Sequence, residues 1–276
     1  MTKKTIVLEV FQPFAQYRNP FTFYYAQSYP LPPKSTIIGM LQNALGRYYD
    51  ECFWNLEVSI HGGFESTFWN YQNLIQGDVS VVRYQNKVKL WNQKRPLYKK
   101  GFKSQRTPVN QQELFNGHLY IFLRGQKKLI EEIKQSLLNP DKLFYLGRSE
   151  DLIFIKNIHD EDNLSFSEKE VKKNIWLTYP TYINLRPKNG ANEFPIENEK
   201  FPVYSIPVKV LFKNNGKTVS NKAEITKSTE READFHTVMY TGIDYTVYLK
   251  EPVKVENYKI DDTDLVFKIP SDYGWL

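Results

Sequence analysis

One segment of the chain is rich in the residue types that bind nucleic acid. Between Val79 and Gln112 there is no aspartate or glutamate, and the charge of these 34 residues is +9, against +6 for the whole chain. The rest of the chain therefore carries −3, so the basicity is local. The basic residues are Arg83, Lys87, Lys89, Lys94, Arg95, Lys99, Lys100, Lys103 and Arg106, and the aromatic ones are Tyr84, Trp91, Tyr98 and Phe102. Basic side chains bind phosphates and aromatic rings stack on unpaired bases, so the segment predicts a nucleic-acid-binding surface.

The same composition has a second explanation. A solvent-exposed hairpin also uses lysines along its edge, because charged edges prevent strands of neighbouring molecules from pairing. That protective role does not require the complete exclusion of acidic residues. We therefore favour nucleic acid as the partner of this segment.

A second group that can bind a phosphate lies where a helix is predicted to begin. Lys34, Ser35 and Thr36 follow two prolines and precede the helical periodicity of residues 35–48. A helix N-terminus with a lysine and two hydroxyl groups suits a phosphate, and capping of the helix by Ser35 or Thr36 explains the hydroxyls equally well. The glycines of a nucleotide-binding P-loop are missing, so that class of site is excluded.

A third group contains residue types that cleave RNA without a metal. Such cleavage needs a base for the 2′-hydroxyl and an acid for the leaving group, roles that histidine, lysine and tyrosine can fill. His118, beside the basic segment, forms the candidate set with Tyr48 and Lys103. A structural histidine at a strand edge is the simpler explanation of His118. We therefore expect a non-catalytic protein, with a metal-independent endoribonuclease as the alternative.

Metal and membrane chemistry are not indicated. The four histidines contain no pair at i+3 or i+4 spacing, and Cys52 is the only cysteine, so no metal, other cofactor or internal disulfide is expected. No apolar run approaches the roughly 18 residues that cross a membrane. The apolar run at residues 5–10 is too short for a signal peptide. These features predict a globular cytoplasmic protein with no membrane partner.

The elements that must position these residues alternate between strand and helix in the first half of the chain. Strands are predicted at residues 5–10, 56–61, 114–123 and 152–158, with strand-like pieces at 21–25, 79–90 and 143–146, and helices at 35–48 and 126–138. Gly62-Gly63 is predicted to end the strand before the basic segment. The order predicts an α+β fold of the ferredoxin-like type over residues 1–158, with a long basic hairpin at about residues 65–115.

Beyond residue 158 the pattern changes to short strands. They are predicted at residues 175–179, 208–212, 235–240, 245–248 and 265–269, separated by turn signals. Residues 159–276 are therefore expected to form a mostly β region packed on the first. RNA-recognition folds use the plan of the first region, which also hosts many other functions.

Two stretches of the chain resemble the signatures of a known family. The run at residues 23–45, which contains Ser-Tyr-Pro-Leu-Pro-Pro-Lys-Ser-Thr-Ile-Ile-Gly-Met-Leu, resembles the N-terminal signature of the CRISPR-associated Cas-five family. Tyr-Leu-Gly-Arg-Ser-Glu at residues 145–150 resembles its second signature. Gln-Arg-Thr-Pro-Val at residues 105–109 is similar to the segment that closes its thumb hairpin. The likeness covers residues 5–158 and is nearest to the I-B-like branch.

This resemblance implies a subunit of the type I CRISPR effector complex Cascade, from the RAMP superfamily, in antiviral defence. Such a subunit caps the 5′ handle of the CRISPR RNA (crRNA) and joins the backbone subunit to the large subunit. Target DNA is then a partner through the complex. One branch of the family instead cleaves precursor crRNA with a tyrosine of the first helix and a Lys-His pair near the thumb. The chain has Lys103-Ser104 in place of such a pair, which argues against cleavage.

The resemblance also assigns roles to individual residues. The basic hairpin corresponds to the thumb, and the start of the first helix and the second signature are expected near the RNA handle. The RNA-binding residues implied in this way are Lys34, Ser35, Thr36, Lys94, Arg95, Lys99, Lys100, Lys103, Gln105, Arg106 and Arg148.

Overall fold

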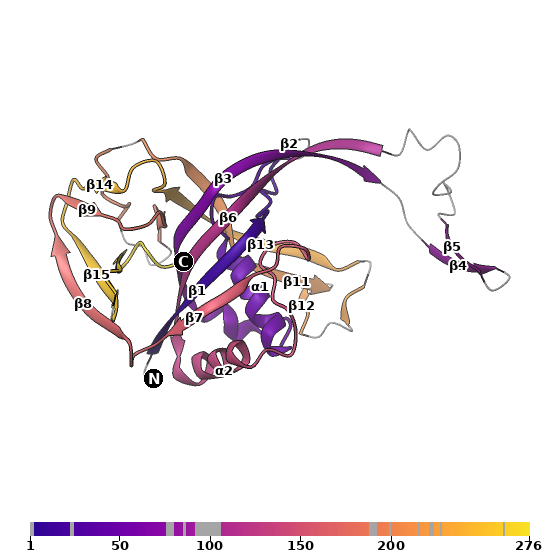
Figure 1. The fold of residues 1–276 in the computed structure, drawn as a ribbon, viewed down its shortest axis with the longest axis horizontal. Coiled ribbons are helices and arrows are strands. Elements are labelled where there is room, and N and C mark those ends of the chain that lie inside the picture. The colour runs from indigo at the N-terminus through magenta and orange to yellow at the C-terminus, as the bar shows by residue number, and fades with distance from the viewer. Residues whose placement is uncertain are drawn as a thin grey trace.

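An antiparallel sheet lies at the centre of the structure (Figure 1). The computed structural model describes residues 3–22, 25–75, 80–84, 87–91, 106–187, 192–198, 200–214, 216–220, 224–226, 228–261 and 263–276. The strands of this sheet are β1 (Lys3–Ala15), β2 (Tyr25–Ala26), β3 (Glu57–Ile75), β6 (Arg106–Gln126) and β7 (Phe154–His159). The order β3-β6-β1-β7 is antiparallel throughout, and β2 joins β6 in parallel beyond the end of β1.

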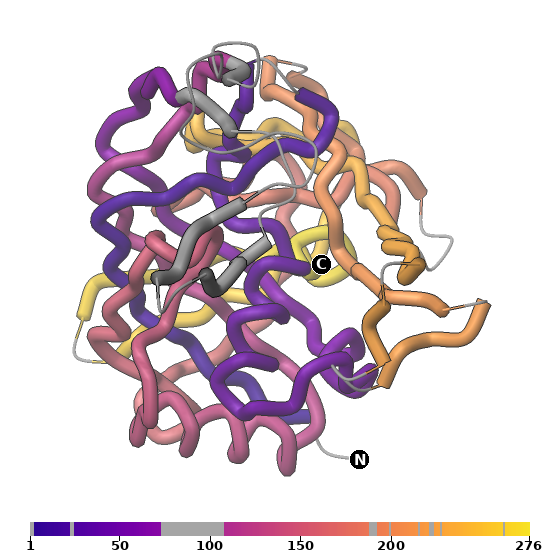
Figure 2. Tube along the Cα trace, turned by 90° about the vertical axis from the view of Figure 1, so that its right-hand side faces the viewer, coloured from indigo at the N-terminus to yellow at the C-terminus, as the bar shows by residue number. Residues whose placement is uncertain are grey.

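Two helices cover one face of this sheet. α1 (Lys34–Leu45) and α2 (Lys127–Leu138) lie side by side (Figure 2), and the short 3-10 helix η1 (Glu51–Asn55) follows α1. Their apolar stripes pack with alternate residues of β1 in one buried cluster, which includes Ile6, Leu8, Ile37, Leu41, Ile130 and Ile133. Full burial of such a side chain contributes about 1.5–3 kcal/mol, so this cluster is a main source of stability. In the described part of the chain, no helix is both long and apolar enough to cross a membrane.

The start of α1 differs from the prediction. The helix begins at Lys34, with Pro33 in the N-cap position and no side-chain cap, so the expected capping by Ser35 or Thr36 is wrong. The ring of Pro33 fixes its φ at −63°, and its backbone is extended, as is usual for an N-cap residue. Ser35 and Thr36 lie in the first turn of the helix and are partly buried.

The end of α1 is set by a glycine. Gly46 has a φ of +66°, and the backbone N–H groups of Gly46 and Arg47 close the helix on the carbonyls of Asn43 and Gln42. The helix therefore stops before Tyr48, which had been predicted as its last residue. α2 begins one residue after its predicted start and ends where predicted.

β3 does not end at Gly62-Gly63, contrary to the prediction. It continues to Ile75, paired with β6 along its whole length. Gly62 has a φ of +128°, and a Cβ at this position would lie 2.1 Å from the carbonyl oxygen of His118. Glycine is therefore needed here for a close approach of two backbones inside the sheet, and not for a turn.

β3 and β6 form a two-stranded ribbon that extends beyond the rest of the sheet (Figure 1). Their pairing reaches from Glu57 opposite Arg124 to Ile75 opposite Arg106. β1 reaches only to the position of Leu114 on β6, so the outer part of the ribbon leaves the body of the protein. The strands β4 (Ser80–Tyr84) and β5 (Lys87–Trp91) pair with each other.

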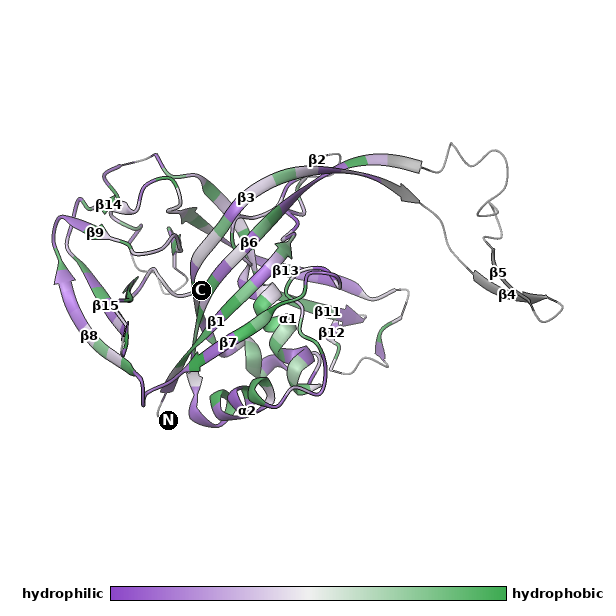
Figure 3. Cartoon of the chain, viewed as in Figure 1, coloured by the Kyte–Doolittle hydropathy of each residue, from purple (hydrophilic) through white to green (hydrophobic). Residues whose placement is uncertain are grey.

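The opposite face of the sheet is partly covered by the end of the chain. β8 (Leu164–Val171), β15 (Val253–Ile260) and β16 (Val266–Pro270) form a second sheet in the order β16-β15-β8. Phe267 and Trp275 pack there against Val7, Tyr120 and Phe122 of the central sheet. The outer strand β8 is largely hydrophilic (Figure 3), in line with its mostly exposed side chains.

The remaining strands lie between β8 and β15 along the chain. They are β9 (Asn174–Trp176), β10 (Tyr182–Asn184), β11 (Val203–Asn214), β12 (Lys217–Thr218), β13 (Glu230–Tyr240) and β14 (Thr246–Tyr248). β10, β13, β11 and β12 form one sheet, and β9 pairs with β14. Tyr182, Ile206 and Val238 belong to the same buried cluster as residues of α1 and α2. The sheet of β10, β13, β11 and β12 therefore packs against these helices.

Several strands in this structure differ from the sequence predictions. Residues 143–146 form no strand and contribute a single bridge, from Tyr145 to Leu152. β8, β10 and β15 had not been predicted. β8 lacks a clean alternation because polar and charged residues occupy both of its faces, and only its pairing with β15 makes it a strand.

His61 is a buried histidine in the centre of the sheet. Its ring packs against Phe122 and Phe267, and one ring nitrogen lies 3.2 Å from Ser59 Oγ. Burial lowers its pKa to about 3. An unfolded histidine has a pKa of about 6.5, so the unfolded chain takes up the proton first as the pH falls. The fold therefore loses stability below about pH 6.5, by about 2 kcal/mol at pH 5.

The variant His61→Gln should lose this acid dependence, because glutamine stays neutral and can still bond Ser59. Urea unfolding at pH 7.5 and pH 5.0 measures the effect. Between these two values the free energy of unfolding should fall by about 2 kcal/mol less in the variant than in the wild type. An equal fall in both proteins would contradict the assignment.

Candidate nucleic-acid interface

The acid-free segment is attached at the outer end of the β3–β6 ribbon. β3 ends at Ile75 and β6 begins at Arg106, so most of the segment lies between these two strand ends. Lys94, Arg95, Lys99, Lys100, Lys103 and Gln105 lie outside the described residues. The predicted contact Arg106 is the first residue of β6. The two strand ends thus attach the basic segment to an arm of the sheet (Figure 1).

A buried carboxylate holds the loop that contains residues 145–150. Asp151 is fully buried, and its Oδ2 accepts hydrogen bonds from the backbone N–H groups of Gln16 at 3.1 Å and Arg148 at 2.8 Å. Gly147 has a φ of +117°, and a Cβ there would lie 2.7 Å from the same oxygen. The motif therefore needs its glycine so that the loop can fold around this carboxylate and stay fixed to the end of β1.

Arg148 braces this loop against β6. Its guanidinium group forms ion pairs with Asp151 at 2.8 Å and with Glu113 of β6 at 3.1 Å. Burial alone would lower the pKa of Arg148, but its hydrogen bonds to Asp151 and Glu113 raise the pKa above the usual value. Arg148 was expected near the RNA. In the structure its guanidinium group faces the carboxylates of Asp151, Glu113 and Glu150.

Lys34 is also engaged inside the protein. Only 8% of the residue is exposed, and its Nζ donates hydrogen bonds to the backbone oxygen of Leu276 at 2.9 Å and to the carbonyl of Trp54 at 3.4 Å. The lysine thus connects the first turn of α1 to the last residue and to η1. Its burial separates it from Ser35 and Thr36, with which it had been grouped as a phosphate site.

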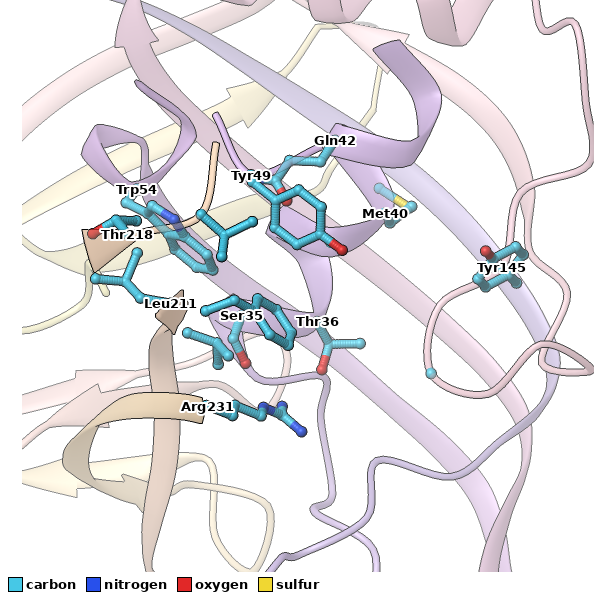
Figure 4. Close-up of a pocket in the computed structure, with 15 residues that line it drawn as sticks. Ser35, Thr36, Met40, Gln42, Tyr49, Trp54, Tyr145, Leu211, Thr218 and Arg231 are labelled. Carbon is cyan, nitrogen blue, oxygen red and sulfur yellow. The ribbon is translucent and has the colours of Figure 1, made fainter. Parts of the chain in front are cut away.

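Ser35 and Thr36 line a cavity of about 330 Å³ beside α1. Figure 4 shows them projecting into the cavity together with Arg231 of β13. The aromatic residues of its wall include Tyr49, Trp54, Phe212 and Tyr145. Hydroxyl groups of a helix N-terminus, a guanidinium group and aromatic rings are the groups that bind a phosphate and a base.

The structure separates the candidate catalytic residues. His118 is exposed on the face of the sheet that carries Tyr120, whereas Tyr48 follows α1 on the opposite face. The hydroxyl of Tyr48 donates a hydrogen bond to Asn43 at 2.6 Å. Lys103 lies outside the described residues. His118 and Tyr48 therefore do not share a site.

Asp151 and Arg231 belong to this region and were not predicted from the sequence. The only local signal for Asp151 is its position three residues after Arg148, a spacing that also suits an ordinary surface ion pair. Arg231 is one charge in a polar stretch. It reaches α1 because β13 pairs with β11, which packs beside that helix, and no local pattern reveals this.

The chain is similar to a known protein family and to several solved structures. The family described as "CRISPR-associated protein (Cas_Cas5)" matches residues 5–180. A structure titled "CRISPR RNA-guided surveillance complex" is 11% identical, with a TM-score of 0.48 and coverage of 91% of each chain. "Crystal structure of a CRISPR protein from Archaeoglobus fulgidus" is 12% identical, with a TM-score of 0.40 and coverage of 96% of this chain and 98% of that chain.

A third structure, titled "Crystal structure of Cas protein", is 20% identical with a TM-score of 0.32. That alignment covers 54% of this chain and 58% of the other, so the chain spans less than two thirds of this relative. The comparison with curated proteins gave no match.

Proposed function

The chain belongs to the CRISPR-associated Cas5 family, whose match spans residues 5–180, and on this premise we propose that it is a non-catalytic RNA-binding subunit of a type I CRISPR effector complex, Cascade. In this role it caps the 5′ handle of the crRNA and joins the backbone subunit to the large subunit, in antiviral defence. The observation that carries the proposal is the acid-free basic segment between β3 and β6. A basic segment attached at the end of the β3–β6 ribbon can contact RNA phosphates away from the core.

We propose a ferredoxin-like RAMP fold for residues 1–158, with the β3–β6 ribbon and its segment as the thumb. The antiparallel order β3-β6-β1-β7 and the two helices on one face support this class. Residues 159–276 form the second, β-rich region of the proposal. The cluster that both regions share supports a tight attachment of the second region to the first.

The proposed RNA contacts are taken from the residues predicted from the sequence. Phosphates of the handle are assigned to the thumb residues Lys94, Arg95, Lys99, Lys100, Lys103, Gln105 and Arg106. Ser35, Thr36 and Arg231 form a second contact around their cavity (Figure 4). Lys34 and Arg148 are left out of the contact set, because their charges are bound to groups inside the protein.

The protein partners of the proposal are the backbone and large subunits of Cascade, with target DNA reached through the complex. Exposed aromatic side chains support such protein contacts, since aromatic residues are enriched in interfaces. Tyr25, Trp69 and Tyr71 are exposed on the ribbon and beside it. The separation of His118 from Tyr48 supports a binding role over the endoribonuclease alternative.

Affinity purification of the tagged chain from its native cells tests this proposal. We expect a uniform short RNA with one shared 5′ end, together with several proteins in stoichiometric amounts. Incubation of repeat RNA with the chain in EDTA should leave the RNA intact. Recovery of the chain without RNA or partners would contradict the proposal, and cleavage in EDTA would replace it with the endoribonuclease.

A further inference from the structure

A row of three rings crosses three neighbouring strands of the central sheet. Phe11 of β1 lies opposite Phe154 of β7 on one side and opposite His118 of β6 on the other. The ring centroids of Phe11 and Phe154 are 6.2 Å apart in a stacked arrangement, and those of Phe11 and His118 are 5.2 Å apart. Direct opposition in the register thus places three flat groups side by side on one face of the sheet.

This ring row is open to solvent. Phe154 is 53% exposed, His118 is exposed and Phe11 is half-buried. A second ring pair extends the surface along β1 and β6, where Phe14 and Phe115 are 46% and 40% exposed with centroids 5.2 Å apart. Aromatic side chains usually lose most of their surface on folding, so a row of exposed rings is an unusual arrangement.

The position of the row follows from how the chain covers the sheet. The helices pack on the other face, under Leu8, Val10 and Leu119. On the face of the row, the layer with Phe267 and Trp275 packs around Val7, Tyr120 and Phe122. The next position beyond His118 in the register is Gly63, where a Cβ would meet no atom within 4 Å. The row is thus bordered by open space on the side of the ribbon.

We propose that Phe154, Phe11 and His118 form a stacking platform for unpaired bases of single-stranded RNA. This inference rests on the proposed function, and it adds base stacking on the body of the central sheet to the contacts of the basic segment. Four-stranded sheets in RNA-recognition proteins stack two or three bases on aromatic residues of adjacent strands. Neighbouring strands lie about 4.8 Å apart, so rings at one level can meet successive bases of one strand of RNA.

The charges around the row fit a nucleic acid. The Nζ of Lys156 lies 5.4 Å from the centroid of the Phe11 ring, within reach of a phosphate next to a stacked base. The carboxylate of Glu9, on the same face, accepts a hydrogen bond from Asn157 at 2.8 Å and lies 3.6 Å from a ring nitrogen of His159. The acidic group nearest the row along β1 is therefore held by neighbours on β7.

The row is also continuous with the proposed RNA-binding arm. β6 carries His118 near its middle, and its first residues, from Arg106 to Gln112, belong to the acid-free segment. One strand therefore connects a surface suited to bases with a segment suited to phosphates. This continuity favours RNA over a protein partner for the row.

Replacement of Phe154 tests the platform with the purified full chain. Phe154→Leu keeps an apolar side chain but removes the aromatic face, whereas Phe154→Trp keeps that face. The probe is a fluorescently labelled 12-nucleotide oligoadenylate, titrated at several salt concentrations. Phe154→Leu should weaken binding about fivefold to a hundredfold, since one stacked base contributes about 1–3 kcal/mol, and Phe154→Trp should retain binding.

The salt dependence separates this site from the basic segment. Loss of stacking should leave the slope of log affinity against log salt unchanged, because no phosphate contact is removed. Phe166→Leu is the matched control, as Phe166 of β8 is 58% exposed and packs against Tyr258 on the other sheet. This control should bind RNA like the wild type.

Three outcomes would overturn the platform. Affinity within twofold of the wild type for both Phe154→Leu and His118→Ala would remove RNA from this face. Unchanged RNA affinity with loss of a co-purifying protein from the native complex would assign the row to a protein interface. A wild-type chain that binds no oligoadenylate at any salt concentration would contradict the proposed function as well.

Discussion

Replacing Lys94, Lys99, Lys100 and Lys103 together with alanine is expected to weaken binding of single-stranded RNA about two hundredfold at about 0.15 M salt. Each phosphate contact on a single strand releases about 0.7 counterions, so four lost contacts change the salt slope by about 2.8. Counterion release contributes nothing to the affinity at 1 M salt. A slope change of about 2.8 between 1 M and about 0.15 M salt therefore corresponds to a loss of about two hundredfold. A titration of labelled RNA at four or more salt concentrations measures both the affinity and the slope.

The matched control removes the same charge elsewhere. Lys127 and Lys128 of α2 and Lys169 and Lys172 near β8 are exposed, so their replacement by alanine also lowers the net charge by four. This control should lose less than about fivefold in affinity, since only long-range attraction is reduced and salt screens it. Equal losses in both variants would show that net charge, and not the acid-free segment, holds the RNA. The melting temperature of each variant checks that the fold is intact.

Gly62→Ala is expected to destabilise the fold by about 4 kcal/mol, enough to prevent recovery of soluble protein if the wild type is marginally stable. The new Cβ would lie 2.1 Å from the carbonyl oxygen of His118 and 2.9 Å from Cα of Leu119, both backbone atoms. The φ of +128° adds strain that side chains rarely accept. Strain and overpacking each cost about 1–3 kcal/mol. Urea unfolding measures the loss.

Gly63→Ala is the control for this experiment. A Cβ at Gly63 would meet no atom within 4 Å, and the residue has no positive φ. Alanine should therefore change the free energy of unfolding by less than about 1 kcal/mol. Comparable losses in the two variants would mean that the close approach at His118 is not what requires glycine at this point of β3.

The parts of the fold that were predicted from the sequence depend on local patterns. α2 was found because its apolar residues repeat at helical spacing, and the two family signatures are contiguous runs of sequence. The acid-free segment is likewise a property of neighbouring residues. Such signals need no knowledge of what lies far along the chain.

The surroundings of other site residues depend on partners far along the chain, which local patterns do not reveal. Lys34 was grouped with Ser35 and Thr36, but its partner Leu276 is 242 residues away. Arg148 was assigned to RNA, whereas Glu113 on β6 takes part of its charge. A basic residue in a motif has the same sequence signal whether it meets a phosphate or a carboxylate, and only the fold distinguishes the two.

The Gly62-Gly63 pair shows the same limit for backbone geometry. Two glycines after an alternating strand are a common turn signal, and this pair was predicted to end the strand. The structure uses Gly62 to let β3 pass close to His118, and the strand continues for 12 residues beyond Gly63, to Ile75. Glycine permits both conformations, so the neighbouring strand decides between them.

The long pairing of β3 with β6 also has a consequence for how freely the chain can vary. The two strands are fixed to each other from Glu57 and Arg124 outward to Ile75 and Arg106, so whatever connects their ends is a closed loop. The entropic cost of closing a loop grows only with the logarithm of its length, and doubling the loop costs about 0.6 kcal/mol. Insertions and deletions between these ends should therefore change the free energy of folding by little. Natural variation can rewrite this segment while the sheet beneath it stays the same.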